Sequence, residues 1–113
     1  MYFKIPKDDE RFIWTRHVVS KMRQYGLSQT RLNHLLNNPE RQEQGIAEGT
    51  TALMQTVGTK KRPTEIWLMY QPIDKKKRII TAWRYPGISP KQKIPIPEEI
   101  IKELEELEQT CSI

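Results

Sequence analysis

Two strand-like segments joined by a short turn constrain the fold of this chain more than any other feature. Residues 65–71 (EIWLMYQ) and 78–85 (RIITAWRY) are rich in the aromatic and aliphatic side chains that are typical of β-strands. Residues 72–75 (PIDK), which lie between them, contain the proline and aspartate that favour a turn. The pattern therefore predicts a long β-hairpin.

The second strand of this hairpin carries cations, a hydroxyl group and aromatic rings. Side chains of a strand alternate between its two faces, so Arg78 and Arg84 are expected on the same face, roughly 20 Å apart. That separation is too large for one phosphate group. The opposite face is expected to carry Ile79, Thr81, Trp83 and Tyr85.

Two helices are expected before the sheet. Residues 13–25 place apolar side chains on or near one face, and Gly26 ends the segment as a helix C-cap does. Ser28 is typical of an N-cap, and the leucines within residues 32–36 give the second helix its apolar stripe. Asn37–Pro39 ends that helix. The short connection predicts an αα-hairpin.

The remaining segments complete an α+β pattern. Residues 42–48 and 50–57 are expected to form two further strands, and residues 58–63 (GTKKRP) a basic loop. The sequence thus predicts two N-terminal helices followed by a four-stranded antiparallel sheet and a C-terminal helix. The helices are expected on one face of the sheet, which leaves the other face free for a ligand.

Residues 1–113 are expected to form a single domain, in which residues 88–113 are an extended proline-rich segment and an acidic helix. Pro97 and the glutamates after it favour a helix start. Its acidic side chains could fold over the basic sheet and mimic RNA. Alternatively, the helix packs through its apolar face and leaves the acids in solvent. That apolar face consists of Ile100, Ile101, Leu104 and Leu107.

Charge is unevenly distributed along the chain. Residues 51–97 carry ten Lys and Arg against two Asp and Glu, whereas residues 98–113 carry one against six. The basic middle suits a nucleic acid, although a solvated basic face is the alternative. The sequence shows no membrane-spanning run and no export signal, which favours the cytoplasm. The lone Cys111 argues against a disulfide framework and a cysteine-based zinc site.

Two short motifs carry a family resemblance. Residues 14–28 (WTRHVVSKMRQYGLS) resemble the opening of a small prokaryotic domain-of-unknown-function family, whose second helix ends near an Asn-Pro pair such as Asn38–Pro39. Residues 78–84 (RIITAWR) resemble the arginine-bearing strand of BrnT-type toxins. Both groups are similar to the RelE/ParE superfamily and the wider barnase-like ribonucleases. The resemblance covers roughly residues 12–85.

This resemblance implies a metal-independent endoribonuclease, often the toxin of a toxin–antitoxin pair. RNA would be the substrate and an antitoxin protein a partner, with no cofactor and no bound metal. Such enzymes attack with the RNA 2′-hydroxyl, so they need a base, an acid and cations that stabilise the phosphorane. The alternative function is a non-catalytic module of the same fold that binds nucleic acid or a partner protein.

His17, Arg84 and Tyr85 are the catalytic candidates. His17 matches the histidine of the family motif, and an imidazole exchanges protons near neutral pH. Its alternative role is to brace the core by a hydrogen bond to a strand. Arg84 would stabilise phosphate charge, and Tyr85 would supply a phenol at the same strand end. Arg84 could also be an ordinary solvent-facing arginine.

Five further residues are candidates for RNA binding. A basic loop of this kind attracts RNA through its charge, although it could equally be a flexible, solvated loop. Arg78 follows three lysines, which suits either an RNA track or plain solvated charge. Thr81 could donate a hydrogen bond to phosphate or serve only as a good strand residue. These candidates are Lys60, Lys61, Arg62, Arg78 and Thr81.

Overall fold

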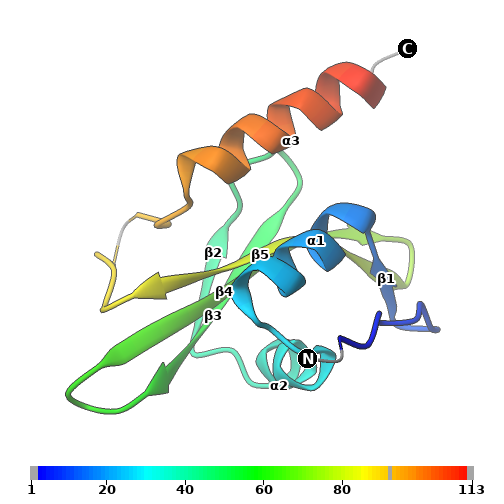
Figure 1. Cartoon of the computed structure of the whole chain (residues 1–113). Helices are drawn as coiled ribbons and strands as arrows, with labels where there is room; N and C mark the ends of the chain where they lie inside the picture. Colours follow the sequence, from blue (N-terminus) through cyan, green and yellow to red (C-terminus); the bar gives the residue numbers. More distant parts are fainter. Residues whose placement is uncertain (1–2, 92, 112–113) are drawn as a thin grey trace.

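The computed structural model describes residues 3–91 and 93–111, which form a five-stranded sheet with three helices (Figure 1). The strands are β1 (Phe12–Trp14), β2 (Arg41–Gln44), β3 (Thr51–Gly58), β4 (Pro63–Ile73) and β5 (Lys76–Pro86). The helices are α1 (Arg16–Tyr25), α2 (Gln29–Asn37) and α3 (Glu98–Cys111). None of these helices is long and apolar enough to cross a membrane. The α+β class is confirmed.

The predicted hairpin is formed by β4 and β5, which lie next to each other in the strand order β1-β5-β4-β3-β2. Both strands are longer than expected and pair from Thr64 opposite Pro86 to the turn. Trp67 lies directly opposite Trp83, and their rings stack with centroids 5.8 Å apart. Cross-strand aromatic pairs of this kind stabilise a sheet. The hairpin therefore forms the centre of the sheet, and β1 and β3 pair with its two outer edges.

The first helix begins later than residues 13–25 predict, because β1 precedes it. This short strand pairs in parallel with β5 and makes the sheet five-stranded and mixed, where four antiparallel strands were expected. Thr15 ends the strand. Its hydroxyl donates to the Ile79 carbonyl at 2.8 Å, and its oxygen accepts from the Val18 N–H at 3.2 Å. This N-cap anchors the start of α1 to β5.

The strand predicted over residues 42–48 is also shorter than expected. β2 ends at Gln44, and residues 45–50 turn back toward β3. The Gly45 N–H donates to the Thr50 carbonyl at 2.9 Å, which closes this turn. A Cβ atom at Gly45 would clash with the Thr50 side chain, so only glycine fits.

The sheet is covered on both faces. Side chains of α1 and α2 pack against one face, where Val18, Leu32 and Ile66 belong to the same buried cluster. On the other face, Ile100 of α3 packs against Trp67 and the rest of a second cluster. The expectation of one free face is therefore wrong, because α3 folds back over it. The apolar face of α3 is only partly used: Leu104 packs against the cluster, whereas Leu107 is 43% exposed.

The segment before α3 is fastened to the sheet by two charged side chains. Glu65 is buried, and its carboxylate accepts three hydrogen bonds. The donors are Trp67 Nε1 at 3.0 Å, the Ser89 hydroxyl at 2.6 Å and the Ser89 N–H at 3.1 Å. Arg41 lies over the Trp67 ring and donates to the main-chain carbonyls of residues 90–91, both at 2.9 Å. These contacts fix where α3 begins.

Removal of the Glu65 carboxylate tests this anchor. Glu65→Ala deprives three donors of a charged acceptor, so we expect the free energy of unfolding to fall by about 2–3 kcal/mol in urea denaturation. Glu10→Ala removes an exposed carboxylate and should change it by less than about 0.5 kcal/mol. Equal effects of the two substitutions would contradict the anchoring role.

Candidate functional site

One stripe of α1 carries three polar side chains that recur about once per helical turn, His17, Lys21 and Gln24. The side chain of Lys21 is only 3% exposed. Its Nζ donates to Gln24 Oε1 at 2.8 Å, Glu99 Oε1 at 3.1 Å and Glu103 Oε1 at 2.6 Å. These contacts use all three donors of the ammonium group. A buried, fully paired charge thus joins α1 to α3.

The imidazole of His17 lies between β5 and α3. Its Nε2 is 3.0 Å from Thr81 Oγ1, and its Nδ1 is 3.3 Å from Glu103 Oε2. An ionised carboxylate next to Nδ1 favours the tautomer that carries its proton there, which leaves Nε2 to accept from the Thr81 hydroxyl. Since a hydroxyl both donates and accepts, Thr81 fits either tautomer. His17 thus connects three elements of the fold.

The surroundings shift the pKa values of these groups in different directions. Burial lowers the pKa of His17; the charge of Glu103 opposes this shift, and that of Lys21 adds to it. Burial also acts to lower the pKa of Lys21, but contacts with Glu103 and Glu99 outweigh it and raise that pKa. The hydrogen bond from Lys21 lowers the pKa of Glu99. A neutral imidazole therefore lies beside a charged ammonium group at neutral pH.

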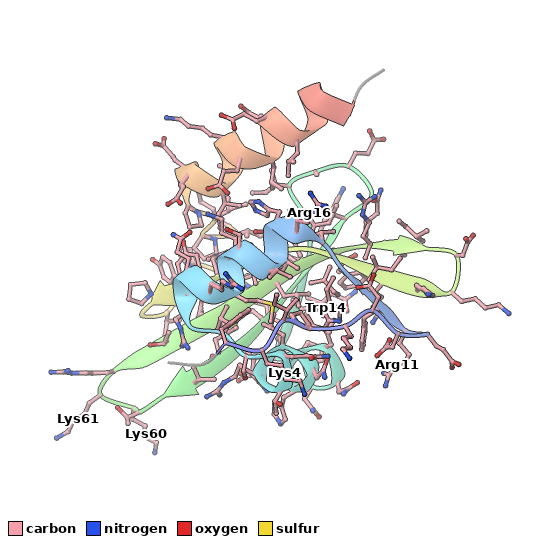
Figure 2. The ribbon with its side chains drawn as sticks, turned by 45° about the vertical axis from the view of Figure 1, so that its right-hand side comes forward. Lys4, Arg11, Trp14, Arg16, Lys60 and Lys61 are labelled. Carbon is pink, nitrogen blue, oxygen red and sulfur yellow. The ribbon has the colours of Figure 1, made fainter. Side chains whose placement is uncertain are left out.

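A pocket of 430 Å³ opens beside His17 at the start of α1. Two arginines line it, Arg16 from the first turn of α1 (Figure 2) and Arg78 from β5, together with the acidic Glu48. Cations beside an apolar wall suit an anionic ligand that carries a ring. The apolar part of the wall consists of Ala47, Met69, Ile80, Leu104 and Leu107.

A β-bulge in β5 determines which of its side chains reach this pocket. Adjacent residues of β4 pair with Ile79 and Thr81, so Ile80 is an extra residue without a partner. The alternation of side chains shifts by one residue at this point. Arg78 therefore lines the pocket, whereas Arg84 lies on the opposite face, against α1. The expectation that both arginines share a face is wrong for this reason.

Arg84 binds the C-terminal end of α1. Its Nε donates to the Tyr25 carbonyl at 2.7 Å, and its Nη2 donates to the Gly26 carbonyl at 3.1 Å. Carbonyls at a helix end lack partners within the helix, so Arg84 acts as a cap. Tyr25 lies roughly 12 Å along the helix from His17. The structure thus brings Thr81 and Arg78 near His17 but places Arg84 at the opposite end of α1.

The other predicted residues also lie away from His17. Tyr85 packs beside the tryptophans on the α3 face of the sheet. Lys60, Lys61 and Arg62 are exposed in the loop between β3 and β4. Figure 2 shows the two lysines at the far end of that hairpin, away from Arg16. The catalytic roles of Arg84 and Tyr85 and the RNA-binding role of this loop stay predictions.

The sequence interpretation did not single out Lys21, Glu99 or Glu103. A signal exists, because His17 and Lys21 are four residues apart and so are the two glutamates, which places each pair on one helix face. Two helices with complementary charges favour a mutual contact. The alternative that leaves all acids of α3 in solvent is wrong for Glu99 and Glu103.

Comparison with family models, curated proteins and solved structures found no match to this chain. Within residues 3–91 and 93–111, no group of His, Cys, Asp and Glu side chains is arranged to hold a metal ion.

Substitution of Arg84 by lysine tests its role as a helix cap. A single ammonium group cannot reproduce the fork with which arginine reaches two carbonyls. We expect Arg84→Lys to lower the free energy of unfolding by about 1–2 kcal/mol in denaturant titrations. Arg31→Lys, at an exposed position of α2, should cost less than about 0.5 kcal/mol. An unchanged stability of Arg84→Lys would contradict the capping role.

The lowered pKa of His17 makes stability depend on pH. Because the imidazole of the unfolded chain has the higher pKa, near 6.5, the unfolded state binds more protons as the pH falls. The free energy of unfolding should therefore be highest above pH 6.5 and decrease as the pH falls through the folded-state pKa. His17→Gln should flatten this decrease in denaturant titrations at a series of pH values. Parallel curves for the two proteins would contradict the shift.

Proposed function

We propose that this chain is a metal-independent endoribonuclease that cleaves single-stranded RNA at His17 and Lys21. The observation that carries the proposal is a shared carboxylate. Glu103 lies 2.6 Å from Lys21 Nζ and 3.3 Å from His17 Nδ1. Two groups that reach the oxygens of one carboxylate can also reach those of one phosphate. A proton acceptor and a cation would then meet at the scissile phosphate.

His17 acts as the general base in this mechanism. The 2′-oxygen bonds to phosphorus as the bond to the 5′-oxygen breaks, which gives a cyclic phosphate and a 5′-hydroxyl. When the substrate phosphate replaces Glu103, the imidazole proton moves to Nε2, which donates to the Thr81 hydroxyl. The free Nδ1 then takes the 2′-proton, and water protonates the leaving oxygen. A positioned base of this kind accelerates a reaction by about 10²–10⁴-fold. The neutral imidazole suits this role because it can accept the proton.

Lys21 stabilises the additional negative charge of the phosphorane. Its ammonium group stays charged, and its donors are already oriented in a water-poor site, where electrostatic stabilisation is strongest. Arg16 and Arg78 bind the neighbouring phosphates of the strand. The apolar wall at Met69 and Ile80 takes a base. Charge from three side chains thus replaces the charge that a metal ion supplies in other nucleases.

A different reaction class is disfavoured by the burial of Thr81. The order Glu103, His17, Thr81 matches the acid, base and nucleophile of a hydrolase triad. However, Thr81 is completely buried within β5 and is not part of the pocket lining. Lys21, by contrast, is covered by two glutamates of α3, which a substrate phosphate can replace. The role of Thr81 is to orient His17.

The alternative function is a non-catalytic module that binds nucleic acid or a partner protein. One observation favours it: the donors of Lys21 and both ring nitrogens of His17 already face groups of the chain itself. As a toxin, the protein would act in the cytoplasm and bind an antitoxin protein. As a binding module, it would bind its ligand without cleaving it.

Incubation with single-stranded RNA in the presence of EDTA tests the proposal. We expect the wild-type protein to cut RNA but not the 2′-deoxy strand. His17→Gln should lower the rate by about 10²–10⁴-fold, because the general base is lost. Arg78→Gln should weaken RNA binding. Lys102→Gln, which removes an exposed cation from α3, serves as the matched control and should cut at the wild-type rate.

Three outcomes are informative. A cleavage rate that survives His17→Gln would contradict the assigned base. Salt-dependent RNA binding without cleavage would support the nucleic-acid-binding alternative, because phosphate contacts release counterions. No binding of RNA at any salt concentration would favour the partner-binding module.

A further inference from the structure

Two acidic side chains of α3 occupy the donors of the proposed site. Glu103 places one oxygen 2.6 Å from Lys21 Nζ and the other 3.3 Å from His17 Nδ1. Glu99 accepts from the same ammonium group at 3.1 Å and from Gln24 Nε2 at 3.5 Å. These contacts cover the face of α1 that the proposed reaction uses.

The carboxylate makes the contacts that a phosphate group would make, since both are anions with paired acceptor oxygens. We infer that Glu103 occupies the phosphate seat formed by His17 and Lys21, and that α3 is a displaceable cover that keeps the site closed. A ligand that carries phosphate opens the site by replacing the carboxylate. The inference rests on the proposed function and adds the regulation of that same site.

Few of the α3 side chains that the structure describes are buried. Among the α3 side chains that the structure describes, Ile100 is the one that is fully buried. Leu107 is 43% exposed, and the side chain of Glu99 is 56% exposed. The other attachment of α3 to α1 is the pairing of Glu99 and Glu103 with the buried Lys21 ammonium group. An anion that competes for Lys21 therefore removes a large part of what holds α3 in place.

The cover stays tethered when it opens. Arg41 binds the main-chain carbonyls of residues 90, 91 and 93, and Glu65 binds Ser89. These contacts hold residues 89–91 and 93 against the sheet, and Ile94 and Ile96 pack against the second cluster. The inferred movement of α3 takes place beyond these residues. Because the chain stays attached to the sheet just before α3, the local concentration of α3 near Lys21 stays high. The site therefore closes again after the ligand leaves.

Opening also enlarges the pocket next to His17. Leu104 and Leu107 form part of its wall and move away with α3. The space beside Arg78 then becomes continuous with the phosphate seat at Lys21. The same helix therefore covers the phosphate position through Glu103 and closes the adjacent pocket through Leu104 and Leu107, as expected for a cover over a single binding surface.

Hydrogen–deuterium exchange of the full chain in inorganic phosphate, compared with chloride at equal ionic strength, tests the inference. Phosphate should speed the exchange of α3 amides and leave β4 and β5 unchanged. Glu103→Gln should show fast α3 exchange without phosphate and bind phosphate about tenfold more tightly in a ³¹P NMR titration. The matched control, Glu105→Gln, removes the same charge from an exposed position of the helix and should behave like wild type.

Identical α3 exchange in phosphate and chloride, with Glu103→Gln indistinguishable from Glu105→Gln, overturns the cover. RNA cleavage by the same proteins separates the two claims. Cleavage without any phosphate effect on α3 supports the nuclease and overturns the cover. Displacement of α3 by phosphate without cleavage supports the cover and overturns the nuclease.

Discussion

The ammonium group of Lys21 must be paired, because an unpaired charge in a buried position is strongly destabilising. Its three acceptors come from two helices that are far apart in the sequence, Gln24 on α1 and Glu99 and Glu103 on α3. Burial of Lys21 therefore requires α3 to lie against α1. Glu103 in turn reaches His17 and thereby ties the imidazole to the same network. The candidate site exists because this charge is neutralised across the fold.

The sheet supplies the other side of the site. Thr15 fixes the start of α1 to β5 through the Ile79 carbonyl, which places His17 over the same strand. The bulge at Ile80 then turns Thr81 toward the imidazole and Arg78 toward the pocket. Without the extra residue, the strand would direct these two side chains to opposite faces. A local irregularity in β5 thus assembles groups that a regular strand would separate.

Local patterns were sufficient to predict the elements whose signals lie within a few residues. The β4–β5 hairpin follows from its composition and turn, and α2 from Ser28 and its leucine stripe. By contrast, β1 has three residues whose spacing also fits a helix, so its identity depends on pairing with β5. The bulge at Ile80 has no glycine or proline to mark it. The contact of His17 with a strand matches the alternative role expected for it, whereas the Lys21–Glu103 contact depends on tertiary packing.

The most direct test of the account is to locate where RNA binds first. A single-stranded 2′-O-methyl RNA, which cannot be cleaved by 2′-hydroxyl attack, would be titrated into the ¹⁵N-labelled protein while the side-chain resonances of His17 and Lys21 are followed by NMR. The account predicts that both resonances shift together with the backbone amides of α3. Shifts confined to residues 60–62 or to Arg84, with His17 and Lys21 unchanged, would contradict it.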